Sequence, residues 1–358
     1  MRWRIGNRPS LYRRLVIVTK LMSIACRFYS TSAITMSLSS SSSSKAFRPS
    51  PHLRGVFVGS GSDGMNEAIV AQAVLQLTDK HPARVAYIGT ATYDLEGPRK
   101  RQTEQFVRLG CEVESLNVAI SGLTQVGQDL IETADVIIVS GGNTLYAMDR
   151  WKLLGLDEKF REAMERGAVL TGGSAGAICW FDGGHSDSMD PDTWRGAMLT
   201  APVQEGDEST DAPECAQDAK AWEYIRIQGL GFIPGLVCPH HDKVQSNGAL
   251  RATDFDRMML RHPTELGIGI DHWAGLRVQG DTYAVLSIPG KEGSVLPDGK
   301  FSSERKGEPG VWIKSVQDGR VKSRLCPSRG KISELLFHPR QICLDPKEEE
   351  CRQQNPVK

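Results

Sequence analysis

The sequence predicts a three-layer α/β/α fold, in which a mostly parallel central sheet carries helices on both faces. From residue 54 onward, short apolar, β-branched runs alternate with segments of helical pattern, as parallel strands and their crossover helices do. Glycine-rich turns directly follow the runs at 54–58, 134–139 and 168–171. Such turns gather at the carboxyl edge of a parallel sheet, where active sites form. The strand ends are therefore where we expect the function.

The elements are expected in a regular order as far as residue 181. The predicted strands are 54–58, 84–88, 112–116, 134–139 and 168–171, and the predicted helices are 66–80, 98–109, 129–133, 144–152 and 157–166. Residues 182–228 are interpreted as loops with an acidic surface insertion at about 200–220. Later elements are an apolar run at 230–237, a helix at 252–260, a strand at 266–270, and an antiparallel pair at 276–278 and 283–288. The catalytic domain is expected to span 51–340, and the polar tail 341–358 is expected to be disordered.

Charge is distributed unevenly along the chain. The 358 residues hold 43 basic and 43 acidic side chains, but the first 50 contain arginines, lysines and many serines and no acid. This composition is typical of an organelle transit peptide, mitochondrial or plastid, followed by a serine-rich linker. Translation from Met36 would discard the signal and leave the protein in the cytoplasm. The remaining body is acidic, which argues against nucleic acid as a partner.

Other composition signals exclude some classes of protein. The apolar run Leu15–Val18 is too short to cross a membrane, so no membrane partner is expected. None of the eight cysteines forms a C-x-x-C pair, and their spacing indicates neither a zinc site nor a disulfide framework. We expect no metal and no cofactor. A homodimer is left open as a possible assembly.

The turn around Ser174 is the strongest candidate for chemistry. An apolar run enters Gly172-Gly-Ser-Ala-Gly176, and a second apolar run leaves it. Small residues on both sides of a hydroxyl allow the sharp strand-to-helix bend that exposes a serine nucleophile. The backbone amides of Ala175 and of Gly141 or Gly142, which ends the preceding strand, are candidate oxyanion donors.

A serine nucleophile needs a base and a group that orients the base. His240 follows an apolar run and Pro239, whereas His185, His241 and His272 are rival bases. For the orienting acid the pattern leaves two candidates open. Asp187 lies in the loop after the nucleophile, and Asp271 ends a strand.

The turn Gly59–Gly64 matches the G-x-G-x-x-G pattern of dinucleotide-binding proteins. A ribose-binding acid is expected at the end of the second strand in that case, but residues 89–92 contain none. We therefore interpret these glycines as a tight turn at the carboxyl edge of the sheet.

Several motifs occur together in one order. They are Gly141-Gly-Asn-Thr144, Gly173-Ser-Ala-Gly-Ala177, Asp187-Ser188, Gly231-Phe-Ile-Pro-Gly235 before Cys-Pro-His240, and Gly267-Ile-Gly-Ile-Asp271. In this the chain resembles the dipeptidase E and cyanophycinase family of serine peptidases over roughly residues 54–290. The resemblance implies a fold like that of class I glutamine amidotransferases, with flavodoxin-like topology and a serine in place of the elbow cysteine.

The resemblance also implies roles for individual residues. Ser174 would be the nucleophile, His240 the general base and Asp187 the acid, with Asp271 as the alternative. Gly142 and Ala175 would form the oxyanion hole. The family prefers Asp on the amino side of the scissile bond, or β-aspartyl links. A basic side chain should then bind that carboxylate, and the candidates for substrate binding are Asn143, Arg251, Arg257 and Lys243.

Two other functions are kept open. An α/β-hydrolase esterase would use Ser174, Asp254 and His272 in that order, although no His-Gly-Gly-Gly oxyanion segment is present. A catalytically impaired peptidase-like binding protein would retain the scaffold without the reaction.

Overall fold

The computed structural model describes residues 49–200, 221–296, 299–300, 302, 307–336 and 345–357. The chain divides into two units, residues 1–43 and 44–358, and every described residue belongs to the second. The predicted transit peptide and the acidic stretch 205–218 lie outside the described residues.

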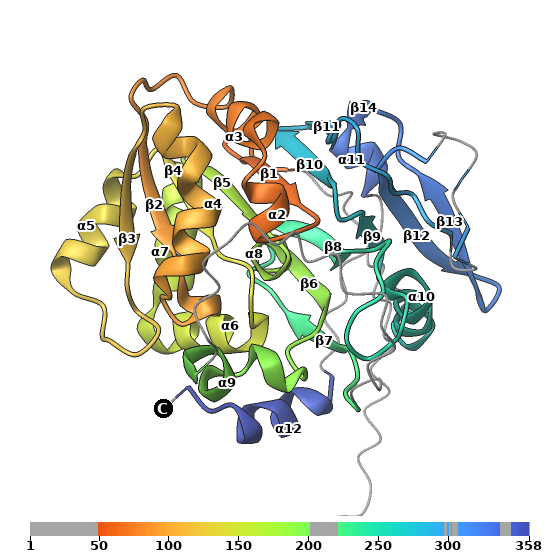
Figure 1. Ribbon diagram of the computed structural model, residues 1–358. Coiled ribbons are helices and arrows are strands. Elements are labelled where there is room, and N and C mark those ends of the chain that lie inside the picture. Colours follow the sequence, from red (N-terminus) through yellow and green to blue (C-terminus); the bar gives the residue numbers. More distant parts are fainter. Residues whose placement is uncertain are drawn as a thin grey trace, which may run out of the picture. The chain divides into compact units, whose positions relative to one another are not determined.

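The described residues place eight strands in a first sheet, in the order β14-β11-β10-β1-β5-β4-β2-β3 (Figure 1). The five neighbouring strands β1, β5, β4, β2 and β3 are parallel, and β10, β11 and β14 extend the sheet with antiparallel pairing. The carboxyl ends of the parallel strands therefore share one edge. The strands are β1 (Arg54–Val58), β2 (Arg84–Ile88), β3 (Glu112–Leu116), β4 (Val136–Val139), β5 (Val169–Gly173), β10 (Ala274–Gln279), β11 (Thr282–Ser287) and β14 (Arg329–Lys331).

A second sheet of six strands, again within the described residues, has the order β13-β12-β9-β8-β6-β7. Strands β6, β8 and β9 are parallel to one another, and β7, β12 and β13 are antiparallel additions. The bounds are β6 (Phe181–Ser186), β7 (Ile225–Gln228), β8 (Ile233–Cys238), β9 (Gly267–Ile270), β12 (Val311–Gln317) and β13 (Arg320–Leu325). Because β9 leads into β10, residues that end β8 and β9 come close to the edge of the first sheet.

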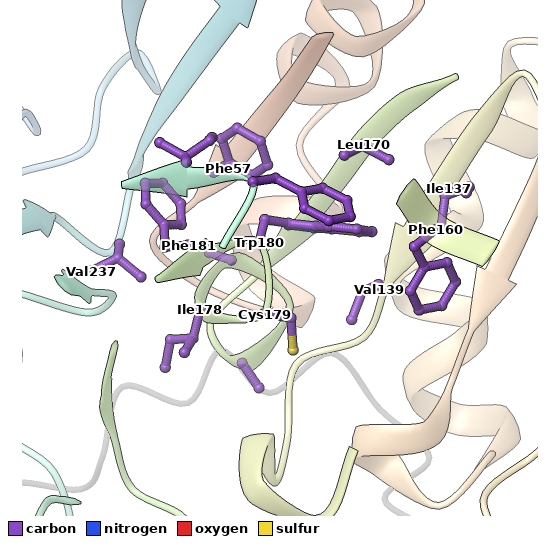
Figure 2. Close-up of a cluster of buried hydrophobic side chains, with 14 of the residues drawn as sticks. Phe57, Ile137, Val139, Phe160, Leu170, Ile178, Cys179, Trp180, Phe181 and Val237 are labelled. Atoms are coloured by element: carbon purple, nitrogen blue, oxygen red, sulfur yellow. The ribbon is translucent and has the colours of Figure 1, made fainter. Parts of the chain in front are cut away.

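Strand β4 shows why the first sheet is covered on both faces. Ile137 and Val139 belong to one buried cluster, and Val136 and Ile138 belong to another, as alternation along a strand requires. Figure 2 shows the first cluster, in which Trp180 lies among aliphatic and aromatic neighbours. Helices α5 to α8 contribute to this cluster, and α2 to α4 contribute to the other. The predicted α/β class, with helices on both faces of a mostly parallel sheet, is confirmed.

In the first half of the chain the helices lie close to the predicted positions. The bounds of all the described helices follow. They are α2 (Ser62–Met65), α3 (Ala68–Leu75), α4 (Glu96–Arg108), α5 (Gln125–Thr133), α6 (Thr144–Leu154), α7 (Leu156–Glu165), α8 (Ala175–Ile178), α9 (Arg195–Thr200), α10 (Arg251–Arg261), α11 (Ile332–Leu335) and α12 (Lys347–Gln354), with 3-10 turns η2 (Thr90–Thr92) and η3 (Pro191–Thr193).

Several described segments differ from the prediction, and the predicted loops at 182–228 also hold helix α9 and strand β7. Residues 182–186 are strand β6 rather than loop, because their small side chains fit between β7 and β8. Strands β12 and β13 form after residue 288, where no strand was assigned from the sequence. Helix α12 forms in the predicted disordered tail and is joined to α6 by an ion pair between Arg352 and Asp149. Each of these elements is stabilised by distant partners, which local composition does not reveal.

Candidate active site

Ser174 lies in a sharp, strained turn between β5 and α8. Its backbone has φ 56° and ψ −120°, a conformation that a residue with a side chain rarely adopts. Holding a non-glycine residue there costs on the order of 1–3 kcal/mol, and such strain gathers at functional sites. The serine is only 8% exposed, at the base of the carboxyl edge.

Glycines make this turn possible through close backbone contacts. A Cβ on Gly173 would lie 1.8 Å from the carbonyl oxygen of Ser60, and one on Gly176 would lie 2.1 Å from that of Val139. Neither position can hold a side chain unless the backbone moves. The ends of β1, β4 and β5 therefore close tightly around Ser174, as the glycine pattern in the sequence indicates.

The end of β1 anchors the backbone of both Ser174 and His240. The amide of Ser174 donates to the carbonyl oxygen of Val58 at 3.2 Å, and the amide of His240 donates to that of Gly59 at 3.0 Å. The nucleophile candidate and the base candidate are thus bonded to consecutive residues of one strand end. His240 also has a positive φ of 48°, so both candidates lie in strained backbone.

The amides of Gly142 and Ala175 take part in no hydrogen bond within the described part of the chain. Gly141, in contrast, donates its amide to the side-chain oxygen of Gln102 at 3.3 Å. Of the two glycines considered from the sequence, Gly142 therefore has the free donor. Its φ of 112°, with the carbonyl of Ala91 packed against it, requires glycine.

The ring of His240 is bonded to a second histidine rather than to an acid. The Nδ1 atoms of His240 and His272 are 2.8 Å apart, and Nε2 of His272 lies 3.0 Å from a carboxylate oxygen of Asp63. His240 and His272 come from the turns after β8 and β9, and Asp63 comes from the short helix α2 that follows β1. The hydrogen bond from His272 lowers the pKa of Asp63, so this carboxylate is ionised at neutral pH.

Burial lowers the pKa of His240 well below its ordinary value, and the positive charges of Arg251 and Lys243 lower it further. His240 is therefore neutral at neutral pH. A neutral imidazole is the form that accepts a proton from a hydroxyl.

Asp187 is placed with Arg251, not with the ring of His240. Its carboxylate accepts a hydrogen bond from the guanidinium of Arg251 at 3.3 Å. That guanidinium is fully buried and also donates to Gln245 and to the carbonyl of His185. The ring of Tyr224 packs 4.9 Å from it. The predicted acid and one predicted substrate-binding residue therefore form a buried ion pair with each other.

Asp271 is bonded to other groups. One oxygen lies 3.2 Å from Nδ1 of His241, and the other accepts hydrogen bonds from Gly310 and from the amide and hydroxyl of Ser294. Burial raises the pKa of Asp271 to about 7. Its partners belong to the second sheet and the loops around it, so the structure does not bring Asp271 to His240.

The remaining predicted residues have other partners. Asn143 is fully buried: its oxygen caps α6 by accepting from Tyr146, and its amide nitrogen donates to Ser188 and Thr193. These bonds make Asn143 the cap of α6, and its predicted role in substrate binding stays a prediction. Arg257 is exposed and lies 3.9 Å from Asp254, on the wall of a separate cavity that Trp222 also lines.

The esterase arrangement is not formed. Asp254 is bonded to Nε2 of His185 at 2.9 Å, whereas His272 is bonded to His240 and Asp63. His185 is itself fully buried. Two of the rival bases, His185 and His241, are thus structural histidines, each with its own aspartate.

Sequence reasoning missed Asp63 altogether and considered His272 only as a rival base. A signal was available for both, because each lies shortly after the end of a strand: Asp63 lies in the short helix α2 after β1, and His272 follows β9. Their pairing was not visible, since the two residues are 209 positions apart.

The described residues contain no group of His, Cys, Asp and Glu side chains arranged to hold a metal ion. Among the same residues, no helix combines the length and apolar character needed to cross a bilayer.

Comparison with known proteins assigns the family. The model of peptidase family S51 matches residues 56–286, which is more than half of the chain and includes Ser174, His240 and Asp187. The chain belongs to peptidase family S51. This confirms the resemblance drawn from the motifs and makes a peptidase scaffold the starting point for the function.

Individual relatives of this S51 member carry different names. A Trypanosoma brucei brucei protein named "G2/mitotic-specific cyclin-1" is 30% identical over 80% of this chain and 88% of its own length. The "Uncharacterized peptidase YgaJ" of Bacillus subtilis strain 168 is 31% identical over 48% of this chain and 60% of its own length. A solved peptidase from an acI-B1 Actinobacterium is 18% identical, with a TM-score of 0.49 over 78% of this chain and 96% of its own.

Proposed function

We propose that this protein is a serine peptidase that hydrolyses short peptides through an acyl-enzyme, with Ser174 as nucleophile and His240 as general base. The preferred substrates would be dipeptides with an N-terminal or isopeptide-linked Asp. Membership in peptidase family S51 supports hydrolysis of peptide bonds. The serine mechanism and the substrate are the parts that we add.

One observation carries the mechanism. Ser174 and His240 both have positive φ, and their amides are bonded to consecutive carbonyl groups at the end of β1. A hydroxyl in a strained elbow, a neutral imidazole anchored to the same strand end, and free amides at Gly142 and Ala175 are the groups that acyl transfer needs.

The reaction would proceed in two halves. Oγ of Ser174 attacks the peptide carbonyl carbon while its proton passes to Nε2 of His240, and the amides of Gly142 and Ala175 donate to the oxyanion. His240 then returns that proton to the leaving amine as the C–N bond breaks. Water then attacks the acyl carbon while His240 takes a proton from it. His240 gives that proton to Oγ of Ser174 as the ester bond breaks.

The electrostatics around His240 support an acidic substrate. The positive charges of Arg251 and Lys243 both act on this ring, and the same field would attract a carboxylate. Arg251 is buried and its charge is offset by Asp187, so Lys243 would contribute more of this attraction.

A fluorophosphonate probe followed by peptide mapping tests the nucleophile. Labelling of wild type at Ser174, and no labelling of Ser174→Ala, is expected. Absence of any label on folded wild-type protein would favour the impaired binding protein instead. Comparison of Asp-X dipeptides, isoaspartyl dipeptides and p-nitrophenyl esters tests the substrate. Turnover of esters but of no peptide would contradict the peptidase.

We also propose that residues 1–50 direct import into an organelle, mitochondrial before plastid. Their basic, serine-rich and acid-free composition supports this. Fluorescent fusions of the full chain and of a chain that starts at Met36 test it. Equal cytoplasmic distribution of both fusions would contradict import.

A further inference from the structure

We propose that His272 and Asp63 are the positioning residues of the active site and hold His240 in its basic tautomer, in the place where an orienting carboxylate would be expected. The chain of side chains is Asp63–His272–His240. This proposal rests on the proposed function, because it describes how the base of that reaction is oriented.

The hydrogen-bond chemistry of the chain allows one assignment when both rings are neutral. The ionised carboxylate of Asp63 can only accept a hydrogen bond. Nε2 of His272, 3.0 Å away, must therefore be the donor. A neutral imidazole carries one hydrogen, so Nδ1 of His272 must be an acceptor.

The same argument continues to the base. Nδ1 of His240 lies 2.8 Å from Nδ1 of His272, and two acceptors cannot share that distance. Nδ1 of His240 must then be the donor, which leaves Nε2 of His240 without a hydrogen. Nε2 is the atom that has to take the proton of Ser174, so the chain selects the reactive tautomer.

The surroundings fix the chain in place. The hydroxyl of Ser60 donates to the carbonyl of His272 at 2.7 Å, and the amide of His272 donates to the carboxylate of Asp242 at 2.6 Å. Ser60 also accepts from the amide of Gly64, beside Asp63. The glycine-rich turn after β1, which the dinucleotide interpretation left without a role, therefore carries the anionic end of the chain.

During the reaction no proton needs to move from His240 to His272 or from His272 to Asp63. When Nε2 of His240 receives the proton of Ser174, Nδ1 of His240 keeps its own and continues to donate to His272. Asp63 then stabilises the imidazolium through the intervening ring. The proton on Nε2 passes on to the leaving amine, and the starting tautomers are restored.

Substitutions that keep or remove the acceptor at Nδ1 of His272 test this directly. His272→Asn places an amide oxygen near that acceptor and should lose no more than about 10-fold in kcat, whereas His272→Ala should lose about 10²-fold, each with KM changed by less than about 3-fold. Asp63→Asn should lose about 10-fold in kcat. A packing role alone would not distinguish His272→Asn from His272→Ala by kcat at constant KM.

Matched controls separate this chain from general damage. His262 is another buried histidine paired with an acid, Glu265, away from the strand edge. His262→Asn should keep wild-type kcat per folded molecule. Asp187→Asn tests the competing acid. The proposal would be overturned if Asp187→Asn lost as much kcat as Ser174→Ala while Asp63→Asn and His272→Ala kept wild-type kcat.

A measurement without turnover keeps the two proposals apart. In ¹⁵N-histidine spectra of folded Ser174→Ala protein above pH 7, His240 should be protonated at Nδ1 and His272 at Nε2, with assignments from His240→Asn and His272→Asn. A hydrogen on Nε2 of His240 would overturn the chain. These spectra report on the tautomers, and fluorophosphonate labelling reports on the nucleophile. Failure of one proposal can therefore be told from failure of the other.

Discussion

His240 and His241 are neighbours in the sequence, but the structure gives them opposite surroundings. His240 faces the strand edge and is bonded to His272, with an ionised and partly exposed Asp63 beyond it. His241 is 1% exposed, packs beside Trp312, and is bonded to Asp271, which is fully buried. The direct histidine–aspartate pair is thus the structural one, and the site beside the nucleophile uses a longer chain.

The two aspartates differ in the same way. A hydrogen bond to His272 lowers the pKa of Asp63, whereas burial raises the pKa of Asp271 to about 7. A histidine next to an acid is therefore not by itself a mark of catalysis. What distinguishes the pairs is their position relative to Ser174 and their access to solvent.

The largest expected effect is on turnover and should separate the two histidines. His240→Ala, like Ser174→Ala, should lower kcat by about 10³-fold or more, because nucleophile and base act as a unit. Steady-state kinetics on the best dipeptide, with unfolding followed by circular dichroism, measure both properties. Substantial turnover by His240→Ala would break the comparison.

His241→Ala should affect stability instead. It removes a buried ring, opens a cavity and leaves the Asp271 carboxyl without its histidine partner, at a cost of about 3 kcal/mol in the free energy of unfolding. Urea unfolding measures this cost. The remaining folded protein should keep its kcat within a few-fold, and a loss of kcat like that of His240→Ala at wild-type stability would reverse the two roles.

The pH dependence of stability should distinguish the aspartates. With its folded pKa near 7 and its unfolded value near 3.8, Asp271 binds more protons in the folded state between these pH values. Its contribution to stability is present below about pH 4 and is lost as pH rises through 7. Relative to Asp271→Asn, wild type should therefore lose about 2 kcal/mol of unfolding free energy from pH 5 to pH 8. An unchanged difference between the two proteins would show that Asp271 does not titrate in this window.

The smallest effect is expected at Asp63, with the opposite sign. Its folded pKa is lowered, so its contribution is present above the unfolded value and is lost as pH falls through the folded pKa. Asp63→Asn and wild type should keep a constant stability difference from pH 5 to pH 8 and converge below pH 4, by less than about 1 kcal/mol because the carboxylate is partly solvated. Unfolding curves at pH 3, 5 and 8 measure this, and a difference that stays unchanged from pH 5 to pH 3 would contradict the lowered pKa.

The sequence by itself determined the α/β alternation of the first half, the strained glycine turn at Ser174 and the neighbouring glycine turns at strand ends. Those features are local: strand periodicity and the steric demands of a tight turn are written in adjacent residues. For the same reason the motifs were sufficient to place the chain in peptidase family S51, and they pointed to His240 as the base candidate.

Only the tertiary structure decided which acid meets which histidine. Asp187 is bonded to Arg251, Asp271 to His241 and Asp254 to His185, while Asp63 reaches His240 through His272. These pairs join residues 30 to 209 positions apart across two sheets. Short polar side chains in turns have no periodic signal, and their partners are set by how distant strand ends pack together. Strand β6 and helix α12 escaped prediction for the same reason, since each is held by contacts with distant parts of the chain.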